Sequence, residues 1–227
     1  MNTLAVMTAL LEALDPEKIL RTGGYVLLFG IIFAESGLLI GFFLPGDSLL
    51  FVAGMAAAGT LTAIGSGNIE LNLWILLPGV FIAAVAGDQV GYMFGKRAGP
   101  ALFRRPDSRF FKKEHLESAE RFFEEHGAKA IVLARFVPVV RTFCPIVAGA
   151  GQMNYRHFVR FNVLGGLLWA VGVTLLGYFL GNVPIVRDNV EIALIAVVAI
   201  SILPIVIEFI RSRMRARSEA AMSDSAS

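Results

Sequence analysis

Residues 133–151 read Leu-Ala-Arg-Phe-Val-Pro-Val-Val-Arg-Thr-Phe-Cys-Pro-Ile-Val-Ala-Gly-Ala-Gly, with two arginines and two prolines among apolar side chains. Charge in hydrocarbon is costly, so arginines persist there mainly where they line a cavity or meet a partner. Proline removes helical hydrogen bonds, and broken backbone at membrane depth is tolerated only inside protein or next to water. This stretch therefore predicts a broken segment, inside a membrane domain, that carries a polar site.

A second apolar stretch, residues 35–54, carries the opposite charge. Glu35 and Asp47 lie on the two sides of a break at Pro45-Gly46. Acids in one broken segment and arginines in another favour a transport or lipid-handling site over a purely structural one.

The composition indicates an integral membrane protein. The 227 residues are 56% hydrophobic and only 17% charged, whereas soluble domains are about one quarter charged. The single cysteine, Cys144, excludes an intrachain disulfide and a thiolate metal cluster. We therefore expect an all-α membrane domain with no separate catalytic domain.

Hydrophobic runs define the expected organisation. Residues 1–22 are expected to hold an interfacial helix, residues 23–210 the membrane domain, and residues 211–227 a basic, disordered cytoplasmic tail. Six apolar runs lie within the membrane domain, at about 24–44, 48–66, 71–94, 130–155, 158–181 and 190–210. The long polar stretch 95–129 contains nine Lys/Arg, and its second part has the pattern of an interfacial amphipathic helix.

The positive-inside rule assigns both the stretch 95–129 and the C-terminal tail to the cytoplasm. Arg156 and Arg160 place the next boundary on the same side. Residues 130–155 are then expected to enter the membrane and return as a re-entrant hairpin, with Pro138 and Pro145 supplying its break. Residues 24–66 are either two full crossings or one hairpin entering from outside, and charge counting leaves this and the side of the N-terminus open.

A short internal repeat supports a two-fold design. Residues 34–54 resemble residues 134–149 in the order Ala-charge, proline, Ala-Gly, and residues 91–95 resemble residues 177–181. The pattern predicts two inverted copies, each a hairpin plus a transmembrane helix, followed by an additional C-terminal transmembrane helix at 190–210. Inverted repeats with broken segments are a transporter design in which ligand binds at the repeat interface.

The acids have two interpretations each. Carboxyl groups in low-dielectric surroundings can bind and release protons near neutral pH, so Glu35 and Asp47 are candidates for proton coupling. The alternatives are that Glu35 faces a surface layer and that Asp47 caps a helix starting at Ser48. Asp88 is either a third protonatable group or, the favoured interpretation, a hydrogen-bonding anchor.

The arginines also leave alternatives open. Arg135 and Arg141 present guanidinium groups that match phosphate oxygens, so they are candidates to bind an anionic headgroup, or to pair with Glu35 and Asp47 when the site is empty. The alternative is structural pairing alone, with Arg135 extending to the cytoplasmic surface.

Other chemistry has little support in the sequence. The three histidines show no ligand spacing, no nucleophile or phosphate-loop motif is present, and no cofactor is expected. We therefore expect neither an enzyme nor a metal site, and the basic stretch indicates anionic lipid rather than nucleic acid as its neighbour. Four glycines spaced four apart, and several residues of the 158–181 run, are expected mainly to serve packing and hydrogen bonding: Gly87, Gly91, Gly95, Gly99, Asn162, Gly165, Gly166 and Trp169.

Taken together, four motifs resemble the DedA family of the SNARE-associated or VTT-domain superfamily: Glu35-Ser-Gly, Pro45-Gly46-Asp47, Gly87-Asp88-x-x-Gly91-Tyr92, and the run from Arg135 through Arg141 to Gly149. The resemblance covers about residues 24–181. One departure is Val139, where the family often has a small residue. The resemblance implies two opposed re-entrant hairpins, a relation to eukaryotic lipid scramblases, and location in the bacterial cytoplasmic membrane.

The resemblance also implies a function. Family members include proton-motive-force-dependent translocases of undecaprenyl phosphate, the lipid carrier of envelope synthesis. The family's important acids fall on Glu35 and Asp47, and its important arginines on Arg135 and Arg141. The alternatives are a proton- or sodium-coupled small-solute transporter, a non-transporting scaffold and a lipid-modifying enzyme. The transported molecule, the coupling ion and the state of oligomerisation, including a homo-oligomer, stay open.

Overall fold

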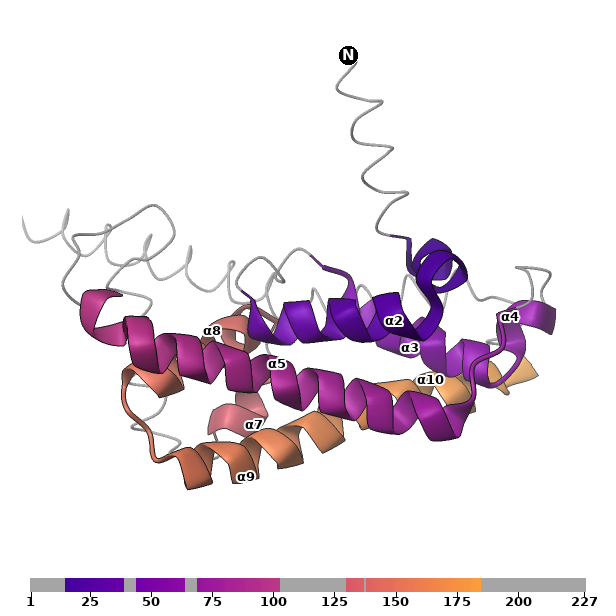
Figure 1. The fold of residues 1–227 in the computed structure, drawn as a ribbon. Helices are drawn as coiled ribbons and strands as arrows, with labels where there is room; N and C mark the ends of the chain where they lie inside the picture. Colours follow the sequence, from indigo (N-terminus) through magenta and orange to yellow (C-terminus); the bar gives the residue numbers. More distant parts are fainter. Residues whose placement is uncertain (1–14, 39–43, 64–68, 103–129, 137, 185–227) are drawn as a thin grey trace, which may run out of the picture.

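The computed structural model describes residues 15–38, 44–63, 69–102, 130–136 and 138–184, and every secondary-structure element in these ranges is helical (Figure 1). The elements are α2 (Pro16–Gly37), α3 (Gly46–Ala57), α4 (Thr60–Ala63), α5 (Leu73–Leu102), α7 (Ala130–Ala134), α8 (Pro138–Ala150), α9 (Tyr155–Gly166), the π-helical η3 (Leu167–Val171) and α10 (Gly172–Gly181). The predicted helical class is confirmed for these residues.

Within the part of the chain that the structure describes, three helices are long and apolar enough to cross a membrane. They are α2, the segment Leu73–Ala98 of α5, and the continuous helix Tyr155–Gly181 formed by α9, η3 and α10. Large apolar side chains on their outer faces, such as Val26, Ile82 and Phe179, are exposed. An apolar surface of this extent suits lipid rather than water.

Among the described helices, the apolar α3 and α8 are too short to cross a membrane. α3 has 12 residues and α8 has 13, which gives lengths of about 18–20 Å against a hydrocarbon core of about 30 Å. α3 is followed by a turn in which Gly59 has a φ of 74° before α4 begins. The re-entrant placement of both segments and the inverted relation of the two halves stay predictions.

The second broken segment differs from its prediction in where it breaks. The helical path is interrupted at Arg135-Phe136, and α8 then begins at Pro138, where a proline is favourable because the first helical residue needs no amide partner. The predicted break at Pro145 is wrong, because Pro145 lies inside α8. Its ring packs close to Gly91 of α5, whose lack of a side chain leaves room for it.

The two short helices each pack on the long helix of the other half. α8 contacts α5, and α3 contacts α10. At each crossing a glycine of the short helix meets backbone of the long one: Gly149 lies against Tyr92 and Lys96, and Gly54 lies against Thr174 and Tyr178. The two glycines are those matched in the sequence repeat.

The predicted packing role of the α5 glycines is confirmed where their surroundings are described. Gly87 lies against Gly37 and Phe33 of α2, and Gly91 and Gly95 lie against α8. Since α5 runs from right to left and α9–α10 from left to right in Figure 1, the two long helices have opposite directions. Apolar side chains of α2, α3, α5 and η3 form the larger core, and Tyr92, Ile131, Cys144 and Phe158 belong to a second one.

The structure describes few of the segment boundaries predicted from the sequence. α5 continues to Leu102, so residues 95–102, which include Lys96 and Arg97, are helical rather than loop. α2 begins at Pro16, capped by Asp15, and bends at Gly24, whose φ is 49°. The rest of the predicted interfacial helix and amphipathic loop, the helix at 190–210 and the tail at 211–227 lie outside the described residues.

The glycine crossings predict a clear stability effect. A Cβ at Gly54 or Gly149 would press against a backbone carbonyl, of Thr174 or Tyr92 respectively. We expect Gly54→Ala and Gly149→Ala each to cost about 1–3 kcal/mol, which lowers the melting temperature of the purified protein by ~2–4 °C for each kcal/mol. The control is Gly172→Ala, because a Cβ there meets nothing within 4 Å. Wild-type melting of both crossing variants would contradict the close backbone packing.

Candidate functional site

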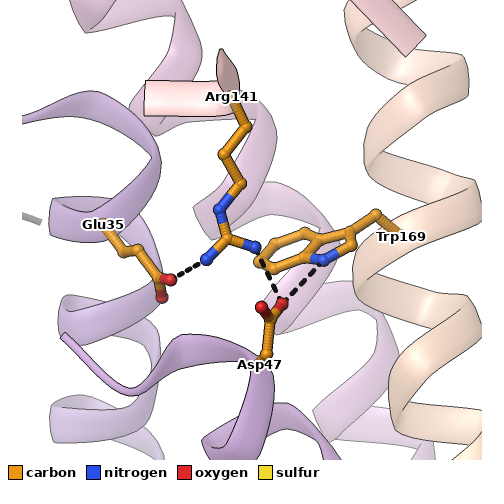
Figure 2. Close-up of polar contacts among 4 residues, drawn as sticks. All are labelled: Glu35, Asp47, Arg141 and Trp169. Carbon is orange, nitrogen blue, oxygen red and sulfur yellow. Dashed lines mark hydrogen bonds and ion pairs between the residues drawn. The ribbon is translucent and has the colours of Figure 1, made fainter. Parts of the chain in front are cut away.

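Side chains from four separate elements meet in the interior of the molecule. Figure 2 shows Glu35 near the end of α2, Asp47 in the first turn of α3, Arg141 on α8 and Trp169 on η3, all directed toward one another. We call these four residues the Arg141 cluster. Two of its members belong to the first broken segment and one to the second.

The guanidinium of Arg141 is held between two carboxylates. Its Nη2 donates to Oε1 of Glu35, and its Nη1 donates to Oδ1 of Asp47 at 2.7 Å. The side chains are 2% exposed for Glu35, 12% for Arg141 and 20% for Asp47. The predicted pairing of these two acids with an interior arginine is confirmed for Arg141.

The local sequence explains how the two acids come so close. Gly46 is required there, because a Cβ at this position would overlap the Glu35 carboxylate. Asp47 does not cap α3: the helix begins at Gly46, its N-cap is Pro45, and it has no side-chain capping bond. The capping alternative is therefore wrong, and the Asp47 carboxylate turns instead toward Arg141.

Trp169 completes the cluster with contacts that the sequence does not predict. Its indole Nε1 donates to Oδ1 of Asp47 at 2.9 Å, and the Cζ of Arg141 lies 4.7 Å from the centre of its ring. The second contact is a cation–π interaction. A tryptophan in an apolar helix gives no sequence signal that separates such a role from ordinary packing.

Arg135 belongs to a second buried cluster. Its Nη2 donates to Oδ2 of Asp88 and to Oδ1 of Asn162, and the amide of Asn162 donates to the carbonyl of Val85 at 3.2 Å. Arg135 is only 5% exposed, so the alternative in which it extends to the cytoplasmic surface is wrong. Asp88 accepts this hydrogen bond and so connects α5 to the segment that follows α7, as expected for a hydrogen-bonding anchor.

The structure therefore separates the two arginines predicted for substrate. Arg141 contacts Glu35 and Asp47, whereas Arg135 contacts Asp88 and Asn162. Gly165 makes room for Arg135, because a Cβ there would press on the arginine's Cδ and Nε atoms. Arg135 is enclosed between α5 and α9, and Arg141 lies beside the more exposed Asp47.

The two clusters carry an unequal number of opposite charges. Together they contain three carboxylates and two guanidinium groups. An uncompensated charge in such surroundings costs several kcal/mol. The interior can therefore accommodate one proton or one bound cation in addition to its arginines. Within the residues the structure describes, no group of three His, Cys, Asp or Glu side chains is arranged to hold a metal ion.

The sequence is similar to a domain family and to several known proteins. A model of the VTT domain matches residues 44–179. The chain is 46% identical to Protein DedA of Escherichia coli over 197 residues, which cover 87% of this chain and 86% of that protein. It is 43% identical to an uncharacterized membrane protein of Mycobacterium tuberculosis over 227 residues, covering 96% and 95% of the two chains. It is 36% identical to the inner membrane protein YqjA of Escherichia coli over 161 residues, covering 71% and 69%. No solved structure matches.

The buried pair of Arg135 and Asp88 predicts strong energetic coupling. Removing one partner leaves an unpaired interior charge, so Arg135→Gln or Asp88→Asn alone should cost about 3–5 kcal/mol of unfolding free energy. The double variant should cost clearly less than the sum of the two, measured by denaturant unfolding in detergent. Additive costs would show that the two side chains do not stabilise each other.

Proposed function

This chain belongs to the DedA family of VTT-domain membrane proteins, and from that membership and the Arg141 cluster we propose that it is a transporter of the bacterial inner membrane that carries a lipid phosphate across the bilayer. Its substrate is an isoprenoid phosphate such as undecaprenyl phosphate, and transport is driven by the proton gradient in support of envelope synthesis. The relative YqjA is named an inner membrane protein, which supports the location.

The observation that carries the proposal is the position of Arg141. A guanidinium group offers a rigid fork of donors that fits phosphate oxygens, and here the fork is already occupied by two carboxylates. A phosphate headgroup can therefore bind by taking the place of one carboxylate. The hydrocarbon tail would stay in the lipid against the apolar outer faces of the long helices.

The charge balance supports coupling to protons. The two clusters hold one more carboxylate than guanidinium, and an incoming phosphate adds further negative charge. Binding is then favourable only when one or more acids take up protons. Glu35 and Asp47 are the acids next to Arg141, so we assign them to proton coupling. Lipid phosphate should consequently bind more tightly as the pH falls.

Because the two arginines lie in different clusters, we assign them different roles. Arg141 is the substrate-binding residue. Arg135 supports the site from the second cluster, where Asp88 and Asn162 hold it, and it contacts substrate only if that cluster opens.

We further propose that the two halves are inverted copies with opposed re-entrant hairpins, at about 24–66 and 130–155. Three features support this architecture: the shortness of α3 and α8, their packing on the opposite half, and the opposite directions of the two long helices. With a further helix at 190–210, the C-terminus lies in the cytoplasm.

Cysteine accessibility tests the second hairpin. In a Cys144→Ala background, Ala128→Cys and Arg156→Cys should both react with a membrane-impermeant maleimide only from the cytoplasmic side, because the segment between them enters and returns. Labelling from opposite sides would show that residues 130–155 cross the membrane, and the inverted-copy proposal would be withdrawn.

Transport is tested by reconstitution into liposomes with labelled undecaprenyl phosphate and measurement of leaflet exchange with and without a pH gradient. Lysine keeps the charge of Arg141 but loses the fork. We expect Arg141→Lys to lower the exchange rate at least about tenfold, as for a lost hydrogen bond between charged groups. Asp47→Asn should abolish the response to the gradient.

The matched control is Arg156→Lys, the same substitution at an exposed arginine, which should exchange lipid at the wild-type rate. If Arg141→Lys and Asp47→Asn both exchange lipid at the wild-type rate, the cluster has only a structural role. Absence of exchange by the wild-type protein, together with gradient-driven uptake of a small solute, would favour the small-solute alternative.

A further inference from the structure

Trp169 shares one oxygen atom with Arg141. Both Nε1 of Trp169, at 2.9 Å, and Nη1 of Arg141, at 2.7 Å, donate to Oδ1 of Asp47. Asp47 is thus held by two donors, while Arg141 is the only side chain that donates to Glu35 among the described contacts. If Arg141 leaves, Asp47 keeps a side-chain donor, whereas Glu35 is left with only the backbone N–H of Gly46 as a donor.

The two acids also differ in their access. The side chain of Glu35 is 2% exposed and that of Asp47 is 20% exposed. An anion that reaches Arg141 therefore approaches on the Asp47 side. Depriving a buried carboxylate of its charged donor is costly, so Glu35 is expected to remain on Arg141 while Asp47 moves away.

The backbone at Trp169 is unusual in a way that fits a positioning role. Residues 167–171 are π-helical within an otherwise α-helical segment, and such single π-helical turns inside α-helices are frequent at functional sites. Trp169 is buried, and the centre of its ring lies 4.7 Å from the Cζ of Arg141. The π-helical turn thus places both the N–H and the ring of Trp169 in contact with the cluster.

We propose that Trp169 is a positioning residue for anion exchange at Arg141, and that Asp47 is the carboxylate that is exchanged. When a phosphate monoester takes Nη1 of Arg141, Asp47 gives up that bond and keeps the one from Trp169. The indole ring holds the guanidinium in place during the exchange, and Glu35 stays bound. This inference rests on the proposed function for the identity of the anion.

The first test separates the N–H of Trp169 from its ring. Trp169→Phe keeps an aromatic face beside Arg141 but removes the donor to Asp47. In the liposome assay, we expect the maximal exchange rate to fall about tenfold while the lipid concentration for half-maximal rate changes by less than about threefold. Trp169→Leu, which loses the ring as well, should also weaken apparent affinity.

The chain supplies a matched control for this substitution. Its other tryptophan, Trp74, is 85% exposed on α5, so Trp74→Phe should leave both parameters unchanged. A Trp169→Phe protein that exchanges lipid at the wild-type rate would overturn the proposal while the transport function stood.

The second test does not depend on transport. In a Trp74→Phe background, Trp169 is the only indole in the chain, so its fluorescence reports on the cluster. The full-length protein in phosphatidylcholine vesicles is titrated with undecaprenyl phosphate, and separately with inorganic phosphate. We expect a saturable change in emission with the lipid phosphate, and none when plain phosphatidylcholine is added.

The outcomes of the two tests distinguish the two proposals. An emission change without leaflet exchange would refute the translocase function and keep Trp169 at an anion site; a response to inorganic phosphate as well would show that the headgroup alone is recognised. Leaflet exchange without any emission change would overturn the role of Trp169 and keep the transport function.

Discussion

The structure depends on one electrostatic requirement, that charge enclosed in a membrane domain be neutralised by a partner. Arg141 meets it by pairing with two acids that come from separate helices. Such pairing needs the helices to approach closely, and glycines at the crossings of α5 with α8 and of α3 with α10 allow this. The charged residues thus depend on the small ones, because the close packing that glycine allows lets the ion pairs form.

Much of the candidate site could be predicted because charged residues in apolar stretches are few and must find partners. Glu35, Asp47, Arg141 and Asp88 were identified on this ground. Which acid meets which arginine could not be predicted, because a sequence gives the charges and not the distances between them; Arg135 pairs with Asp88 and Asn162. Trp169 was treated as packing, since its indole N–H acts only once the fold brings Asp47 to it.

The fold was predictable in class and less so in local detail. Hydropathy located the long helices, and the sequence repeat anticipated the glycines that meet at the two crossings. The positions of the prolines predicted the helix breaks less reliably than hydropathy predicted the helices. Pro138 begins a helix as its chemistry favours, but Pro145 lies within one, where it provides no amide for the carbonyl of Arg141 four residues earlier. The proline lies close to Gly91 of α5, and a tertiary contact of this kind cannot be recognised in a local sequence pattern.

The pairing of early acids with late arginines also bears on how the protein is made. Glu35, Asp47 and Asp88 leave the ribosome before either Arg135 or Arg141 has been synthesised, and Trp169 follows later still. A nascent chain that stops short of residue 135 thus holds three interior carboxylates without their cations, and α3 without α10 to pack on. The ion pairs of Arg135 and Arg141 and the packing of α3 on α10 can therefore form only after the second half of the chain has been synthesised.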